Sequence, residues 1–278
     1  MPATTSGRRS LAQSRLNLAV AICAAVLISC GPTGSADAPP DPWNEAVAKT
    51  KPRPSKRART SASPTPSNPS ASPTASGAPA PSPGPHGSQQ VTGSSAVALT
   101  FDDGPDPTWT PKVLALLRKH KVKATFCVVG IEVKRHPKLI GEIVRDGHTL
   151  CNHTWDHDLR LGKRSPGHIK ANLARTNAAI LSAVPGAQIP YFRQPGGMWT
   201  KRGVRVVREL DMVPLHWNVD PRDWTKPPAR QISSFVKRET KKGDIVLLHD
   251  GGGNRTQTYR ALHDVLPHLT RRFQLTPL

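Results

Sequence analysis

The sequence lacks an apolar run long enough to cross a bilayer, and it is poor in acidic residues. A transmembrane helix needs about 20 apolar residues, whereas the apolar run at residues 16–29 is shorter. Only 19 Asp and Glu stand against 39 Lys and Arg, which gives a formal net charge of +20. Such a chain is expected to adhere to polyanions. This balance predicts retention at an anionic surface and says nothing of chemistry.

The first 30 residues are typical of a bacterial export signal. Residues 1–15 are polar and carry three arginines, and the apolar run that follows has the length of a secretory signal. Its end, Leu27-Ile28-Ser29-Cys30, resembles the bacterial lipobox, in which the cysteine is acylated. We predict a lipoprotein signal peptide at 1–29 with lipidation at Cys30, a plain secretion signal being the alternative. In both cases the mature chain works outside the cytoplasm, either anchored to the outer face of the cell membrane or secreted.

Residues 30–94 are rich in Pro, Ser, Ala, Thr and Gly, with a basic cluster at 49–59. Such a composition cannot bury enough apolar surface to offset the entropy lost on ordering. We predict a disordered tether that holds a folded domain away from the membrane. Exported chains rarely meet nucleic acid, so no nucleic-acid partner is expected. The basic cluster indicates solvated charge, or attraction to anionic lipid and wall polymer.

From residue 95 to 278, apolar β-favouring runs alternate with segments of helical periodicity. Strands are predicted at 97–103, 124–130, 149–153, 191–195, 213–219 and 244–249, with a weak seventh at 274–276. Helices are predicted at 111–120, 137–145, 166–183, 201–210, 228–241 and 258–272. This alternation predicts an α/β fold with parallel strands and crossover helices. We expect a single domain, a distorted (β/α)7-type barrel, acting as a monomer. No glycine-rich phosphate loop follows the first strand, which argues against an open nucleotide-binding sheet.

Four cysteines are present. Cys23 lies in the predicted signal and Cys30 at the predicted lipidation site, whereas Cys127 and Cys151 lie in predicted strands. Paired strands are about 5 Å apart, so these two cysteines can bridge if their strands are neighbours. An oxidising location favours a disulfide there.

Polar residues follow several of the predicted strands. Asp102 and Asp103 end the first strand, His153 and His157 follow the third, and His249 ends the sixth. The C-terminal ends of the strands carry the site in βα barrels. We therefore expect these side chains to lie close together.

One carboxylate and two neutral imidazoles form a ligand set that leaves positions open for water and substrate. Asp103, His153 and His157 are the predicted ligands of one divalent metal ion. An HxxxH pair by itself is more often structural, but the paired carboxylates at the same rim favour a metal site. Zinc is the first expectation, and cobalt, manganese and nickel accept the same donors.

The other polar residues fit a hydrolysis. Asp102 would take the proton from a water, and His249 would protonate a leaving nitrogen or oxygen. Arg193 and Asp223 are expected to orient Asp102 and His249 respectively. The alternative for this second pair of residues is an Arg–Asp ion pair that only supports the rim.

Five short motifs surround these residues. They are Thr100-Phe101-Asp102-Asp103-Gly104-Pro105, His153-Thr154-Trp155-Asp156-His157, Phe192-Arg193-Gln194-Pro195, Asp220-Pro221-Arg222-Asp223-Trp224 and Leu247-Leu248-His249. In this order they resemble the motifs of the polysaccharide deacetylases of carbohydrate esterase family 4, which carry the NodB homology domain, over about residues 95–275. The resemblance implies a base, three metal ligands, an acid and two supporting side chains at the positions named above.

The resemblance also implies substrate contacts by Pro195, Gly196, Trp224 and Leu247. The last two would form an apolar wall for the acetyl methyl group. The family commonly has an aromatic residue where this chain has Gly196. A glycine still supplies the backbone N–H that helps to hold an oxyanion, but the floor of the sugar groove must differ.

The expected function is metal-dependent removal of N-acetyl groups from an amino-sugar polymer, with release of acetate. The predicted location makes the N-acetylglucosamine of peptidoglycan the nearest substrate, followed by chitin oligomers. The alternatives are an acetylxylan esterase and a non-catalytic, lipid-anchored protein that binds the cell wall. The expected partners are therefore a cell-wall glycan and, through the lipid anchor, the membrane.

Overall fold

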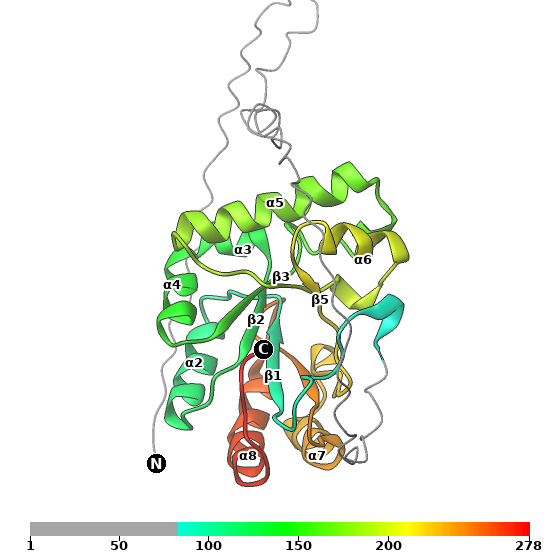
Figure 1. Ribbon diagram of the computed structural model, residues 1–278. Helices are drawn as coiled ribbons and strands as arrows, with labels where there is room; N and C mark the ends of the chain where they lie inside the picture. Colours follow the sequence, from blue (N-terminus) through cyan, green and yellow to red (C-terminus); the bar gives the residue numbers. More distant parts are fainter. Residues whose placement is uncertain (1–82) are drawn as a thin grey trace, which may run out of the picture. The chain divides into compact units, whose positions relative to one another are not determined.

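The computed structural model describes residues 83–278 (Figure 1). The predicted signal peptide at 1–29, Cys30 and the predicted tether up to residue 82 lie outside the described residues. Within the described part of the chain, no helix combines the length and the apolar character needed to cross a membrane.

Six parallel strands form one sheet in the order β5-β4-β3-β2-β1-β6. They are β1 (Ala98–Asp102), β2 (Thr125–Val128), β3 (Thr149–Asn152), β4 (Tyr191–Phe192), β5 (Val213–Pro214) and β6 (Ile245–His249). Val219, five residues after β5, bridges to Val246 on β6 at the opposite edge of the sheet. This bridge closes the sheet into a barrel, and the predicted distorted barrel is confirmed.

Helices separate the strands and cover the outside of the sheet (Figure 1). They are α2 (Thr110–Lys119), α3 (Gly130–Arg135), α4 (Pro137–Arg145), α5 (Pro166–Ala183), α6 (Lys201–Arg208), α7 (Ala229–Glu239) and α8 (Thr256–Arg272). Short 3-10 turns lie at η1 (Pro85–Gly87), η2 (Leu161–Lys163), η3 (Pro195–Gly197) and η4 (Asp223–Thr225). The start of α5 has a clear cause: Ser165 accepts a hydrogen bond from the backbone N–H of His168, and Pro166 occupies the first helical position. The sequence analysis missed α3, which has only six residues.

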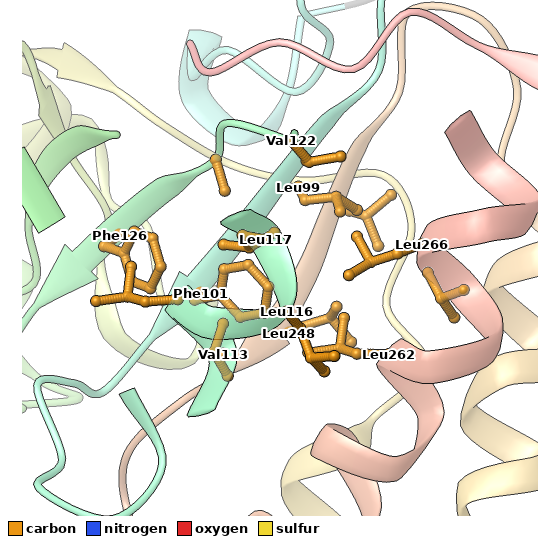
Figure 2. Packing of buried hydrophobic residues seen from close by; sticks show 14 of the residues in the cluster. Leu99, Phe101, Val113, Leu116, Leu117, Val122, Phe126, Leu248, Leu262 and Leu266 are labelled. Atoms are coloured by element: carbon orange, nitrogen blue, oxygen red, sulfur yellow. The ribbon is translucent and has the colours of Figure 1, made fainter. Parts of the chain in front are cut away.

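The two faces of the strands differ in character. Leu99 and Phe101 lie on the outward face of β1 and belong to the main core cluster, which also contains Leu117 of α2 and Leu262 of α8 (Figure 2). The alternate positions point into the barrel, where Ala98 packs in a small inner cluster with the two cysteines. Small inward side chains leave room for the polar groups at the ends of the strands.

Cys127 and Cys151 are register partners on β2 and β3. They form a disulfide inside the barrel, with their Cα atoms 4.2 Å apart.

Three predicted boundaries need correction. The folded part begins before residue 95, because Gln89 N–H donates to Pro214 O at 2.7 Å and Thr92 N–H donates to Gly243 O at 2.8 Å. The polar composition of residues 83–94 concealed this backbone pairing. The strand predicted at 213–219 is interrupted after Pro214, and the seventh strand is a single bridge between Val97 and Leu275.

Candidate active site

Asp102 and His249 lie side by side at the C-terminal ends of β1 and β6. They are register partners in the parallel ladder, and their exposed fractions are only 3% and 8%. Asp102 shares the inward face of β1 with Ala98 and Thr100. The next residue, Asp103, leaves the strand with a left-handed φ of 73°. The two adjacent carboxylates therefore differ in their main partners, although Asp102 Oδ2 also lies 3.6 Å from His153 Nε2.

Arg193, which follows β4, holds Asp102. The guanidinium is fully buried, and its Nη1 donates to Asp102 Oδ1 at 2.7 Å and to Thr100 Oγ1 at 2.8 Å. Its Nη2 donates to the carbonyl oxygen of His216 at 3.2 Å. A charge-assisted, buried pair of this kind fixes the orientation of the carboxylate.

Asp103, His153 and His157 converge on one point. Asp103 Oδ1 lies 3.4 Å from His153 Nε2 and 3.2 Å from His157 Nε2, and the three ligand atoms lie within 4.8 Å of one another. The loop that carries the histidines has left-handed φ values at Thr154 (70°) and His157 (57°). Such backbone angles cost roughly 1–3 kcal/mol each and concentrate at functional sites. The predicted ligands are therefore brought together by a loop held in an unfavourable conformation.

This donor set fits a divalent cation. His153 Nδ1 lies 2.8 Å from the carbonyl oxygen of Arg193, so an N–H at Nδ1 donates to that oxygen and leaves the lone pair of Nε2 facing Asp103. Asp103 Oδ1 is a buried oxygen for which the described residues provide no hydrogen-bond partner. A buried carboxylate oxygen facing two imidazole nitrogens suits a metal with N and O ligands.

The electrostatics of the carboxylate agree with this fit, whereas those of His157 favour its protonated form until a cation displaces the proton. Burial favours the neutral form of Asp103, but the His153 and His157 imidazoles outweigh it and hold the pKa of Asp103 well below its usual value. Burial likewise lowers the pKa of His157, and the Asp103 carboxylate reverses the effect and raises that pKa. The cluster therefore keeps its carboxylate ionised at neutral pH, as a metal ligand requires.

His249 forms a second, separate pair with Asp223. His249 Nδ1 lies 2.7 Å from Asp223 Oδ1, and Asp223 Oδ2 accepts hydrogen bonds from the His249 backbone N–H at 3.0 Å and from Thr258 Oγ1 at 2.7 Å. Burial alone would lower the pKa of His249. The Asp223 carboxylate, with smaller contributions from Asp103 and Asp102, raises it to about 9. His249 is therefore protonated at neutral pH and can give up a proton.

Known proteins are similar to this chain in sequence and in fold. The sequence profile of the polysaccharide deacetylases matches residues 89–215. A chitooligosaccharide deacetylase of Bradyrhizobium is 40% identical over 200 residues, which are 68% of this chain and 91% of that protein. The chain belongs to the polysaccharide deacetylase family. A peptidoglycan-N-acetylglucosamine deacetylase of Bacillus cereus is 39% identical over 63% of this chain and 82% of its own length. The solved structure of the peptidoglycan deacetylase PdaC from Bacillus subtilis superposes with a TM-score of 0.60 at 28% identity, covering 66% of this chain and 88% of that one.

The four residues of this polysaccharide deacetylase domain that are predicted to contact substrate differ in their exposure. Pro195 and Leu247 are buried, and Leu247 lies on the inward face of β6, two residues before His249. Gly196 is exposed and has a left-handed φ of 61°. Trp224 is 47% exposed, with the Arg222 guanidinium 5.5 Å from its ring centroid. Contact of these residues with substrate stays a prediction.

Two buried ionisable residues near Asp103 in the deacetylase domain were not predicted from the sequence. Asp250 is fully buried and accepts a hydrogen bond from Thr110 Oγ1 at 2.6 Å. Arg255 is 4% exposed, donates from Nη2 to Gly252 O at 2.9 Å, and lies 4.0 Å from Asp103 Oδ2. Two sequence features could have identified these residues. Asp250 directly follows His249, and Arg255 follows a glycine-rich turn.

An open cleft of about 500 Å³ reaches two of the three predicted metal ligands. Asp103 and His157 line it together with Glu132, Arg135 and residues 252–253. The ligand cluster is therefore reachable by a substrate larger than water.

Proposed function

We propose that this protein is a metal-dependent hydrolase that removes N-acetyl groups from an amino-sugar polymer. The observation that carries the proposal is the convergence of three groups at one rim: the Arg193–Asp102 pair, the ligand set around Asp103, and the His249–Asp223 pair. A catalytically inactive protein that only binds the cell wall would not need all three groups together at one rim.

Each residue has a defined task. Asp103, His153 and His157 would hold the cation, which when bound acidifies a water and polarises the acetyl carbonyl. Asp102, oriented by Arg193, takes the proton of the attacking water. His249 donates its proton to the leaving nitrogen, so that acetate and a free amine are released.

Two further residues support this chemistry. Asp223 keeps His249 protonated until that step. The backbone N–H of Gly196 would stabilise the developing oxyanion.

Peptidoglycan N-acetylglucosamine is the substrate that we propose first, and chitin oligomers come second. Two relatives of near-equal identity carry these two substrate names, so similarity alone does not separate them. The predicted export of the chain favours the wall polymer. Acetylated xylan is the third substrate, because the same attack by water cleaves an acetyl ester.

The test is acetate release by the purified protein from bacterial peptidoglycan, chitopentaose and acetylated xylan, each with and without chelator. We expect release from peptidoglycan that stops with chelator and returns with zinc. Release from xylan alone would make the protein an esterase. A rate unaffected by chelator would overturn the metal assignment, and no release from any polymer would overturn the hydrolase assignment.

We also propose that the protein is a lipoprotein on the outer face of the cell membrane, acting as a monomer. The lipobox-like sequence before Cys30 and the Pro- and Ser-rich segment after it support this location. Mass spectrometry of the N-terminal peptide from the membrane fraction tests it. A peptide that begins at Cys30 and carries the mass of a diacylglyceryl group is expected, and a soluble, unmodified mature chain would contradict it.

A further inference from the structure

Two large apolar side chains are exposed next to Gly196 at the edge of the site. Leu159 is 50% exposed and Met198 is 51% exposed. A Cβ built on Gly196 would lie 2.9 Å from Leu159 Cδ2 and 3.6 Å from Met198 Cγ. The two side chains therefore flank the same backbone position from different loops, and Leu159 fills the space into which a side chain at position 196 would grow.

We call these two side chains, Leu159 and Met198, the apolar shelf. Hydrogen bonds to backbone carbonyl groups hold the loops that carry them. Gln194, which is 2% exposed, donates from Nε2 to the carbonyl oxygens of Asp158 at 3.2 Å and Leu159 at 3.4 Å. Thr200 Oγ1 donates to Gly162 O at 2.7 Å. The loop before η2 is thus fastened on both sides to the loop that follows β4. An apolar surface fixed in this way loses little entropy when a ligand covers it.

The shelf is continuous in sequence with catalytic parts of the site. Leu159 lies two residues after His157, and Met198 lies five residues after Arg193, which orients Asp102. A polymer whose acetamide reaches the ligand cluster must extend past the neighbouring loops. Hexopyranose rings present a face of C–H groups, and that face gains free energy when it is buried against aliphatic side chains.

We propose that the apolar shelf is a subsite for a sugar ring of the same polymer, next to the ring that carries the reacting acetamide. This inference rests on the proposed function and adds to it a contact that recognises chain length. Two side chains are far too small for a stable protein interface, which buries about 800 Å² on each partner. A sugar ring matches the size of the shelf, whereas a second protein chain does not.

The test compares Leu159→Ala, Met198→Ala and the double variant with wild type on chitobiose and chitopentaose. Leu181→Ala is the matched control, because Leu181 is also an exposed leucine (42%) but lies on α5. We expect KM for chitopentaose to rise about five- to tenfold in the double variant, with kcat within about twofold. KM for chitobiose, which has at most one ring to offer, should rise less, and the control should match wild type.

Binding gives a readout that does not depend on turnover. In an Asp102→Asn background, calorimetry with chitopentaose should show a Kd that is weaker by the same five- to tenfold when the shelf is removed. An active wild type whose KM and Kd are unchanged by the double variant would overturn the subsite while leaving the proposed function intact. Self-association of wild type that the double variant abolishes, measured by sedimentation, would assign the shelf to a second copy of the chain and overturn the subsite as well. An inactive wild type that still binds the pentamer more tightly than the double variant would instead contradict the hydrolase alone.

Discussion

The two carboxylate–histidine groups of the site are built in opposite ways. Asp103 is shared between two imidazoles at 3.2 and 3.4 Å, and its Oδ1 has no hydrogen-bond partner among the described residues. Asp223 is 1% exposed and accepts three hydrogen bonds at 2.7, 2.7 and 3.0 Å. The first group is arranged for a cation, whereas the second is complete within the protein. In the proposed function, the chain therefore assigns metal binding and proton donation to separate groups of residues at one rim.

We call Asp103 with its two histidines the ligand half of the site, and His249 with Asp223 the acid half. The difference between them predicts that a substitution can impair one half without impairing the other. Variants of the ligand half should change metal content, and variants of the acid half should change the pH dependence of turnover. The largest effects test the ligand half and the base beside it.

Substituting His153→Ala should remove both activity and metal. The ring supplies one of the three candidate ligand atoms, and alanine has no donor atom to replace it. We expect metal content after dialysis to fall below about a tenth of wild type. Metal analysis and the acetate assay measure the two effects. Full metal content in His153→Ala would show that the ligand set is assigned wrongly.

Substituting Asp102→Asn should abolish activity and keep the metal. The amide preserves the shape of the side chain and can still accept the bond from Arg193 Nη1, but it cannot take a proton. We expect kcat to fall by about a thousandfold or more, with metal content equal to wild type. Loss of metal in this variant would mean that Asp102 is a ligand and would merge the two halves.

Substituting Asp223→Asn tests the acid half. Burial lowers the pKa of His249 and the Asp223 carboxylate raises it to about 9, so His249 carries its proton through the neutral range and loses it as the pH rises through 9. Without the carboxylate, the alkaline limb of kcat should move down by about two units, and kcat at pH 8 should fall by about tenfold. An unchanged alkaline limb with unchanged metal content would show that His249 is not the acid.

The sequence predicted the barrel and the candidate metal ligands well, because both predictions start from short local patterns in the chain. Asp103 at the end of a β-favouring run, and His153 and His157 four residues apart, were predicted as ligands, and the structure brings them together. The strand alternation predicted the barrel. The barrel prediction depends on periodicity, and the ligand prediction also depends on the expectation that the strand ends meet at one rim.

Contacts between distant segments were harder to predict. The pairing of Gln89 with the strand edge depends on backbone groups, which composition does not reveal. Nothing in the sequence around Asp250 indicates burial, and only the packing of Thr110 and the loop after β1 against it shows that its carboxyl is buried. Leu159 was outside every motif, and although it lies two residues after His157, only the fold shows that it lies beside Gly196.

The smallest expected effect comes from Asp250, which belongs to neither half of the site. No cationic side chain of either half is paired with its carboxyl group. Burial, with repulsion from Asp103 and Asp102, raises its pKa from 3.8 to about 7, although the bond from Thr110 opposes this. In the unfolded chain the carboxyl loses its proton near pH 4, whereas in the folded protein it keeps it to about pH 7. Unfolding free energy should therefore decrease between these values, by at most about 4 kcal/mol.

Substituting Asp250→Asn removes this titration and leaves a carbonyl oxygen for Thr110. In the presence of chelator, the Tm of the variant relative to wild type should rise between pH 5 and pH 8, on the order of 5 °C. Adding metal should shrink this rise, because a cation at Asp103 attracts the Asp250 charge as well. Thermal unfolding followed by circular dichroism measures both. A Tm difference that does not change with pH would show that Asp250 is ionised throughout, and that the ligand half has a second charge available for the cation.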